Sequence, residues 1–328
     1  MVQLLEIERL TENELTEYLI TQVPSFDLGP VSHLEKAGEG NMNVVLRAVF
    51  QEGSLIVKQA KPYVQKYPSI AAPIERGEME AAFYAETKMI KGVAQWLPEI
   101  YAFDKANHIL VMEDLGVGSD FTFWYQANQN IDWETVGHLL DFLSFLHQGA
   151  TEGEPLINGA MRRLNHAHIF DLPFRADCGF ELNAMHDGLQ NLAAELIYPN
   201  RALADFAAHW GQIYLTAKDG ALLHGDYYPG SWLHTAKGLK IIDPEFGFTG
   251  PAAFDLGVMH AHLKFAGATA LQIDEAFKVY GAYDHKAVEA FSGIETLRRL
   301  FGVAQLPLTH DLTSRKALTV ETLKSLDL

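Results

Sequence analysis

The sequence is almost devoid of cysteine, since Cys178 is the only one among 328 residues. A single thiol cannot form an internal disulfide, so the chain lacks the cysteine framework of small secreted domains. This absence is typical of proteins that work in a reducing compartment. We therefore expect a cytoplasmic protein whose stability comes from an ordinary hydrophobic core.

Positive charge is also scarce: 25 Lys and Arg face 42 Asp and Glu, a formal net charge of −17. Such an excess of negative charge repels nucleic acid and anionic lipid. No apolar run approaches the roughly 18 residues of a membrane span, and acidic residues interrupt the opening segment, unlike a signal peptide. We therefore expect that the protein binds neither nucleic acid nor a membrane. The sequence does not decide between a monomer and a homodimer.

Repeats, low-complexity tracts and long charge blocks are absent as well. Hydrophobic residues make up 48% of the chain and charged residues 20%, a composition typical of globular proteins and unlike that of disordered or fibrous ones. The length exceeds the usual ~100–200 residues of one domain. The composition and length together predict a globular protein with two lobes.

Strand-like patterns dominate the first part of the chain. A helix is predicted from Thr11, which with Glu14 forms a capping box. Apolar runs separated by glycines over residues 33–57 predict a β-hairpin and a third strand. Residues 74–93 have helical spacing, and two more strands joined by the turn KANH complete a β-β-β-α-β-β order up to residue 115.

After Gly118 the pattern changes to long helices, interrupted by short strands at ALLHGD and by the hairpin SWLHTAKGLKIID. A small strand-rich lobe followed by a larger helical lobe is the organisation that this pattern indicates. The two glycines within residues 115–119 mark the predicted boundary between the strand-rich and the helical lobe. We therefore predict one lobe over residues 1–117 and a second over residues 118–328.

Two features of the first lobe could bind phosphate. In AGEGNMN (residues 37–43), glycines allow close approach of a ligand and offer bare amides to phosphate oxygens, although a tight hairpin turn is the alternative. Lys58 ends the apolar run LIVK, where a buried ammonium needs a carboxylate or phosphate partner. Glu78, Glu80 and Glu86 on the following helix are candidates, and a solvated strand end is the alternative.

The most specific pattern is HGDYYPGS, followed by DPE. In kinase-type phosphoryl transfer, one Asp accepts the proton of the acceptor hydroxyl, and a residue five positions later holds a metal ion. Asp226 and Ser231 have this spacing. A second Asp after a hairpin holds metal against the phosphates, which matches Asp243, and Glu245 adds another oxygen ligand suited to Mg²⁺.

These motifs resemble the aminoglycoside-phosphotransferase/choline-kinase superfamily. The residues that carry the resemblance are GEGNMN, the strand lysine, LVMEDLG, HGDYYPGS, DPEFGFTGPAAFD and a late Arg-Arg before a G-x-A stretch. Within the superfamily the chain is most similar to the 5-methylthioribose kinases, over residues 33–115 and 222–304. The resemblance implies an α+β, protein-kinase-like two-lobe fold, with a small antiparallel-sheet N-lobe and a larger, mostly helical C-lobe.

The resemblance also implies an activity and a role for each matching residue. The activity is an ATP- and Mg²⁺-dependent transfer of the γ-phosphoryl group to a hydroxyl of a small sugar-like acceptor. The first lobe would bind the nucleotide, through a phosphate-covering loop, a lysine with its glutamate and an adenine hinge. Its implied residues are Gly38, Gly40, Asn41, Lys58, Glu80, Met112, Glu113 and Leu115.

The second lobe would carry the chemistry. The resemblance implies Asp226 as the base, Asp255 and His224 as supports of its loop, and a set of Mg²⁺ ligands and substrate residues. The implied ligands are Ser231, Asp243 and Glu245, and the implied substrate residues are Arg298, Arg299 and Tyr227. Because adjacent helix residues point about 100° apart, we expect only one of the two arginines to aim squarely into the cleft.

Other functions remain as alternatives. One is an aminoglycoside or amino-alcohol phosphotransferase, because YYP in the HGD motif replaces a smaller stretch and the chain is shorter than the kinases it resembles. Another is a catalytically silent nucleotide-binding regulator, against which the intact lysine and acidic residues argue. A zinc site is disfavoured, since His260 and His262 would point about 200° apart on a helix.

Overall fold

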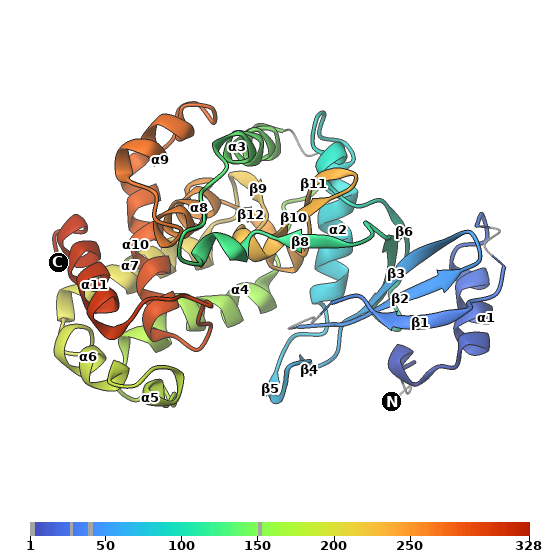
Figure 1. Cartoon of the computed structure of the whole chain (residues 1–328), viewed down its shortest axis with the longest axis horizontal. Helices are drawn as coiled ribbons and strands as arrows, with labels where there is room; N and C mark the ends of the chain where they lie inside the picture. Colours follow the sequence, from blue (N-terminus) through green and yellow to red (C-terminus); the bar gives the residue numbers. More distant parts are fainter. Residues whose placement is uncertain (1–3, 27–28, 39–41, 150–152) are drawn as a thin grey trace.

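The computed structural model describes residues 4–26, 29–38, 42–149 and 153–328. It has two parts, a small sheet-containing part at the N-terminal end and a larger, mostly helical part at the C-terminal end (Figure 1). This α+β architecture is the one that the sequence predicts. The lobe boundary between residues 117 and 118 stays a prediction.

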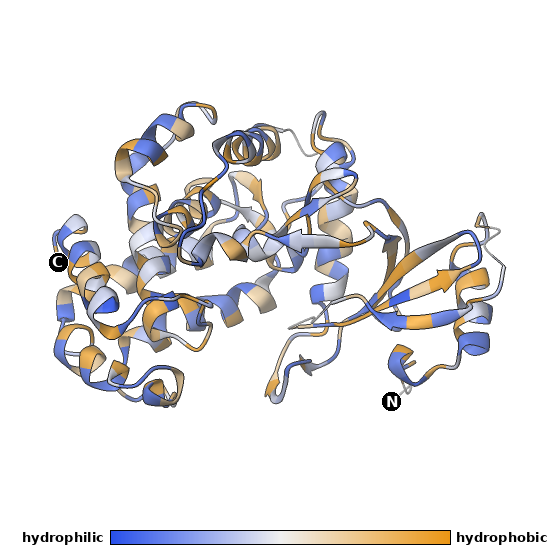
Figure 2. Ribbon diagram, viewed as in Figure 1, coloured by the Kyte–Doolittle hydropathy of each residue, from blue (hydrophilic) through white to orange (hydrophobic). Residues whose placement is uncertain are grey.

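The first part is built on a five-stranded antiparallel sheet, in which hydrophobic residues recur along the strands (Figure 2). In spatial order the strands are β1 (His33–Lys36), β2 (Val44–Phe50), β3 (Gly53–Gln59), β7 (Ile109–Glu113) and β6 (Ile100–Asp104). Lys58 of β3 pairs with Val45 on one side and with Leu110 on the other. The predicted strands are confirmed.

One helix packs on each face of this sheet. The outer helix α1 (Glu12–Gln22) begins at Thr11 with the predicted capping box and shares a core cluster with Ile109 and Val111 of the sheet. The inner helix α2 (Arg76–Thr87) belongs to the other cluster, with Leu110 and Met112. Because side chains alternate between the faces of a strand, β7 is apolar throughout its buried length.

The second part consists of helices around a buried pair. Its helices are α3 (Trp133–Gln148), α4 (Gly159–His166), α5 (Leu182–Met185), α6 (Leu189–Leu196), α7 (Arg201–Thr216), α8 (Ala253–Phe265), α9 (Ala270–Phe277), α10 (His285–Phe301) and α11 (Leu312–Ser325). The buried pair is α8 and α10. A Cβ atom at Gly257 of α8 would lie 2.6 Å from the Phe291 Cβ atom of α10, so only glycine permits this approach.

Short strands and single helical turns lie between the longer elements of both parts. The strands are β4 (Tyr63–Val64), β5 (Tyr67–Ala71), β8 (Gly118–Asp120), β9 (Ala221–Leu223), β10 (Trp232–Thr235), β11 (Gly238–Ile241) and β12 (Phe248–Gly250). The turns are η1 (Ile7–Arg9), η2 (Ala94–Trp96), η3 (Thr122–Tyr125), η4 (Ala167–Asp171), η5 (Leu172–Phe174), η6 (Pro229–Ser231) and η7 (Pro244–Phe246). The predicted hairpin is β10–β11.

The sequence pattern did not predict β4, β5, β8 or β12, which are two to five residues long. Within the ranges that the structure describes, none of the helices has the length and apolar character needed to traverse a lipid bilayer.

Candidate functional site

The junction of the two parts holds a buried lysine between two carboxylates. Lys58 of β3 is only 6% exposed, and its Nζ atom lies 2.8 Å from the carboxylate of Glu80 on α2. The same Nζ atom donates to Oδ1 of Asp243, at 2.5 Å. Of the three glutamates that the sequence offers as partners, the structure selects Glu80, which faces the sheet.

The charges of this group depend on each other. Burial alone would lower the pKa of Lys58, but the carboxylates of Asp243 and Glu80 outweigh it and raise that pKa above its ordinary value. Burial raises the pKa of Glu80, against the lowering effect of Lys58. An ammonium ion held charged inside the protein can interact with a phosphate entering the junction.

Asp243 is the exposed member of this group. Its side chain is 51% exposed, whereas that of Glu80 is 2% exposed. Its backbone is left-handed, with φ 62° and ψ 48°, a conformation that costs free energy in any residue other than glycine. Strained backbone of this kind is concentrated at functional sites. The turn η7 begins directly after it, with Pro244 at its first position.

A second acidic residue, Asp226, lies in the loop after β9. The loop is held from below by Asp255 of α8, whose carboxylate accepts hydrogen bonds from the backbone N–H groups of His224, at 2.7 Å, and Gly225, at 3.0 Å. Gly225 has φ 84°, and a Cβ atom there would lie 2.2 Å from the Phe246 carbonyl oxygen. The bracing role that the resemblance implied for Asp255 is therefore confirmed by geometry.

Both arginines of α10 converge on Asp226. An Nη2 atom of Arg299 lies 3.4 Å from Oδ1 of Asp226, and that of Arg298 lies 3.7 Å from the same oxygen. The expectation that only one arginine aims into the cleft is wrong. Both side chains bend toward Glu295, one turn earlier on the helix, and this brings their ends together.

These charges set the state of Asp226. Burial raises the pKa of Asp226, and the nearby guanidinium groups of Arg299 and Arg298 oppose that rise. Its side chain remains 25% exposed. A carboxylate with a raised pKa that is still reachable suits the acceptance of a proton.

Glu245 occupies an ion pair across the two parts. Asn43, directly before β2, donates through Nδ2 to Oε2 of Glu245 at 2.9 Å, and Nε of Arg76 lies 3.3 Å from the same oxygen. Arg76 is fully buried and also donates to the carbonyl groups of Lys61 and Met42. Composition and motif gave no signal for Arg76, because an arginine at a helix start is ordinarily solvated.

Three oxygen-bearing side chains at this junction are candidate Mg²⁺ ligands, and the carboxylate of Asp243 is the most accessible of them. Asp243 offers a half-exposed carboxylate, while Ser231 Oγ donates to the Asp226 carbonyl oxygen at 2.9 Å and Glu245 is engaged by Asn43. Among the described ranges no group of three or more His, Cys, Asp or Glu side chains is arranged to hold a metal. Mg²⁺ is commonly bound by one or two carboxylates and the phosphates of a substrate, so this donor set suits it.

The segment between β7 and β8 is anchored by Asp114, which the sequence did not single out. Its carboxylate accepts two hydrogen bonds from Arg47 of β2, through Nε at 2.6 Å and Nη2 at 3.1 Å. Ser54 of β3 donates to it at 2.5 Å, and the Gly116 amide at 2.8 Å. A bidentate pair with these two additional donors fixes the hinge backbone relative to the sheet.

The predicted hinge residues flank this anchor. Met112 and Leu115 are buried. The Glu113 amide donates to the Glu99 carbonyl oxygen, at 2.8 Å, and its carboxylate is 2.5 Å from Nζ of Lys237 in the β10–β11 turn. A cationic residue of the second part thus holds the hinge from the opposite side.

Not every predicted residue reaches the site. Tyr227 is fully buried, and its hydroxyl donates to the Leu139 carbonyl oxygen at 2.9 Å. Its ring stacks on Phe142 of α3, so Tyr227 is a core residue, and the predicted contact with substrate is wrong. Its neighbour Tyr228 faces the site instead, with the guanidinium group of Arg299 4.8 Å from its ring centre.

The glycine loop is described only in part. Gly38 has φ 111°, with open space where a Cβ atom would stand. Gly40 and Asn41 lie outside the described residues. Their predicted contact with phosphate stays a prediction.

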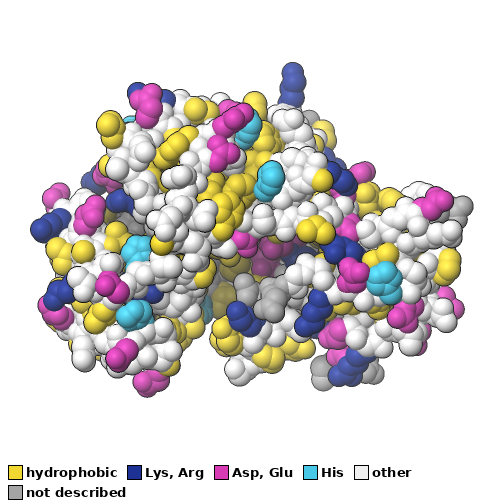
Figure 3. Space-filling view, viewed as in Figure 1, with side chains coloured by type: hydrophobic (Ala, Val, Ile, Leu, Met, Phe, Trp, Pro, Cys, Tyr) yellow, Lys and Arg dark blue, Asp and Glu magenta, His cyan; other side chains and the backbone are white. Residues whose placement is uncertain are grey.

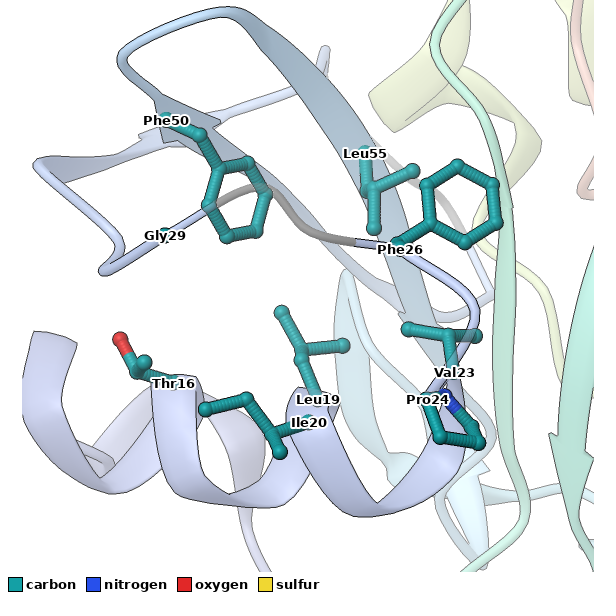
Figure 4. Close-up of a pocket in the computed structure, with 9 residues that line it drawn as sticks. All are labelled: Thr16, Leu19, Ile20, Val23, Pro24, Phe26, Gly29, Phe50 and Leu55. Carbon is teal, nitrogen blue, oxygen red and sulfur yellow. The ribbon is translucent and has the colours of Figure 1, made fainter.

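Acidic side chains line the hollow between the two parts in the space-filling view (Figure 3). A separate cavity of about 300 Å³ lies between α1 and the outer face of the sheet (Figure 4). Leu19, Val23, Phe26 and Leu55 are among its lining residues, and none of the site residues described above borders it.

A sheet-containing lobe and a helical lobe, with a buried lysine–glutamate pair and two acidic loop residues where they meet, define the kinase-like class of folds. The family model described as "APH: Phosphotransferase enzyme family" matches residues 35–291. The chain belongs to this phosphotransferase family.

Its relatives include methylthioribose kinases. One from Exiguobacterium sibiricum is 29% identical over 273 residues, which cover 80% of this chain and 65% of the relative. Another, from Geobacillus kaustophilus, is 30% identical over 275 residues, which cover 80% of this chain and 67% of the relative. The chain thus spans about two thirds of the length of these relatives.

Two solved structures share the fold. The choline kinase LicA from Streptococcus pneumoniae is similar with a TM-score of 0.51 and 16% identity, covering 95% of this chain and 97% of that one. A spectinomycin phosphotransferase in complex with ADP and spectinomycin is similar with a TM-score of 0.54 and 13% identity. The match covers 97% of this chain and 94% of that one.

Proposed function

We propose that the chain is an ATP- and Mg²⁺-dependent small-molecule kinase that transfers the γ-phosphoryl group to a hydroxyl of a sugar-like acceptor. The observation that carries the proposal is the junction itself. A buried Lys58 contacts Glu80 and Asp243. The loop that carries Asp226 is joined to the one that carries Asp243, because Nε2 of His224 lies 2.9 Å from the Ile242 carbonyl oxygen. The family membership and the similarity to methylthioribose kinases support it.

Each side chain has a distinct task in this proposal. Lys58 would hold the α- and β-phosphates, oriented by Glu80. Asp243, with Ser231 and Glu245, would hold Mg²⁺, which when bound neutralises charge on the phosphates. Asp226 would orient the acceptor hydroxyl and accept its proton. The rate would then come from positioning and electrostatics, because phosphoryl transfer requires little covalent work from the protein.

The donors beside Asp226 support a sugar-like acceptor. Two guanidinium groups lie within 3.7 Å of the Asp226 carboxylate, and their charges are balanced by Asp226 and by Glu295, with which both arginines also pair. The planar sets of donors of the two arginines suit neighbouring hydroxyl groups, such as those of a sugar.

The decisive experiment is a screen for acceptor-dependent ADP release with ATP and Mg²⁺. Methylthioribose and other pentoses are tested beside amino alcohols and aminoglycosides, and the phosphorylated product is identified by mass. We expect turnover with a sugar or thio-sugar. Turnover with an aminoglycoside alone would overturn the acceptor class, and nucleotide binding without product from any acceptor would indicate a silent regulator.

The two arginines are expected to contribute unequally. Arg299 hydrogen-bonds Asp226, stacks on Tyr228 and donates to the Ala304 carbonyl oxygen, whereas Arg298 lies farther from Asp226. Arg299→Ala should raise the acceptor KM or lower kcat by at least about tenfold, equivalent to ~1.4 kcal/mol.

Arg298→Ala should have a smaller effect, and ATP binding should barely change in either variant. The matched control is Arg163→Ala, which removes an exposed arginine of α4. Steady-state kinetics with the best acceptor measure the difference. If both variants of α10 behave like the control, the two arginines have no role in acceptor binding.

A further inference from the structure

Behind Asp226 lies a closed set of polar side chains to which the proposed function assigns no role. Its centre is Glu295 of α10, which is 1% exposed. Oε2 of Glu295 accepts a hydrogen bond from Nε of Arg298 at 2.5 Å, and Oε1 accepts one from Nε of Arg299 at 2.7 Å. The Glu295 carboxylate thus holds both arginines, each through its Nε atom.

The opposite side of Glu295 is held by a histidine and a tyrosine. Nε2 of His262 on α8 lies 3.0 Å from Oε1 of Glu295, and the Tyr125 hydroxyl lies 2.5 Å from Nδ1 of His262. Burial lowers the pKa of His262 to about 4, so the ring is neutral at pH 7. A neutral ring has one donor and one acceptor; Nε2–H therefore donates to Glu295, and Nδ1 accepts from Tyr125.

Helix spacing explains why this arrangement places both guanidinium groups together. Arg298 and Arg299 follow Glu295 by three and four residues, and both positions lie on the helix face of residue 295. Because each arginine is anchored through Nε, its Nη2 atom can face Asp226. An arginine side chain loses considerable rotamer freedom when it is ordered, and here that ordering is achieved before any acceptor arrives.

We propose that Glu295 is the positioning residue of the acceptor site, and that His262 and Tyr125 set the orientation of its carboxylate. The inference rests on the proposed function and extends it from residues that contact the acceptor to residues that act through Arg298 and Arg299. The chain of contacts begins at η3, directly after the hinge and β8, and ends at the catalytic loop.

A neutral amide cannot replace this carboxylate. Three donors, from Arg298, Arg299 and His262, meet the two oxygens of Glu295. Glutamine keeps the size but offers one oxygen, and its NH₂ group would face a donor. Glu295→Gln should therefore release at least one guanidinium group from its fixed direction.

The experiment compares Glu295→Gln with a matched control, Ser292→Ala. Ser292 is buried on the same helix, and its hydroxyl bridges to Nδ1 of His260 on α8, at 2.7 Å, as Glu295 bridges to His262. Both changes alter a side chain that joins α8 to α10, but only Glu295 holds the arginines. We expect Glu295→Gln to raise the acceptor KM about tenfold with the ATP KM unchanged, and Ser292→Ala to change neither.

A second measurement is independent of turnover. The Nε–H signals of Arg298 and Arg299 in ¹⁵N NMR spectra should be protected from exchange with solvent in the wild-type protein and in Ser292→Ala. They should lose that protection in Glu295→Gln. Should the wild-type protein phosphorylate none of the acceptors, the proposed function fails, whereas these signals still decide whether Glu295 positions the arginines.

Tyr125→Phe covers the case in which Glu295→Gln does not fold. It removes only the hydroxyl that fixes His262, so we expect a smaller rise in the acceptor KM, about threefold, and partial loss of Nε–H protection. The proposal is overturned if folded Glu295→Gln, or Tyr125→Phe in its place, keeps both the wild-type acceptor KM and the protected arginine signals.

Discussion

Asp226→Asn is expected to keep the fold and the affinity for ATP while kcat falls by about 10²–10⁴-fold, the range typical of general acid–base groups. The amide has the size of the carboxylate and can still accept a hydrogen bond from Arg299, which lies 3.4 Å from Asp226 Oδ1. It cannot accept the proton of an acceptor hydroxyl. The loss should therefore appear in kcat rather than in nucleotide binding.

Single-turnover kinetics with the best acceptor, beside calorimetric titration of nucleotide, separate these effects. Asp219→Asn is the matched control, because it makes the same chemical change at an exposed position just before β9. Asp226 has been misassigned if its variant turns over at close to the wild-type rate.

Asp243→Ala should abolish activity, with a loss of about 10³-fold or more, and should remove the Mg²⁺ dependence of nucleotide binding. Asp243 offers a half-exposed carboxylate beside Lys58, and hard oxygen ligands of this kind bind Mg²⁺ together with phosphates. Lys58 keeps its other partner, Glu80, so the junction should remain folded.

Asp243→Asn separates charge from backbone strain. Residue 243 has φ 62°, a conformation that asparagine tolerates better than alanine does. The asparagine variant should be the more stable of the two but equally deficient in Mg²⁺-dependent binding. An unaltered Mg²⁺ titration in Asp243→Asn would show that the carboxylate is not a metal ligand.

Local pattern was sufficient for most of the fold. Thr11 and Glu14 predicted the start of α1, because a capping box acts over three residues. Lys58 at the end of an apolar strand predicted a buried partner, since an unpaired ammonium in a sheet is costly. These signals are local in the chain, or follow from the cost of burying one group, and both kinds are readable in a sequence.

Contacts between distant residues were not readable in this way. Arg76 and Glu245 meet although they are 169 positions apart, and Asp114 gathers Arg47 and Ser54 from two other strands. Tyr227 belongs to a motif that suggested a substrate contact, yet it packs into the core. A sequence states which groups exist but not which way a loop residue turns.

The sequence by itself determined the class of fold, the order of the five sheet strands and of the helices α1 and α2 in the first part, and the lysine and acidic residues of the candidate site. Periodicity, capping and motif spacing indicate these features, because each of these patterns depends on residues that are close together in the chain. Spacing left Glu78, Glu80 and Glu86 open as partners of Lys58, and the tertiary structure decided for Glu80, the one that the resemblance implied. The tertiary structure also decided that Glu295 turns Arg298 and Arg299 toward the carboxylate of Asp226. The physical reason is that the packing of α8 against α10 buries Glu295 and orients its hydrogen-bond donors around it.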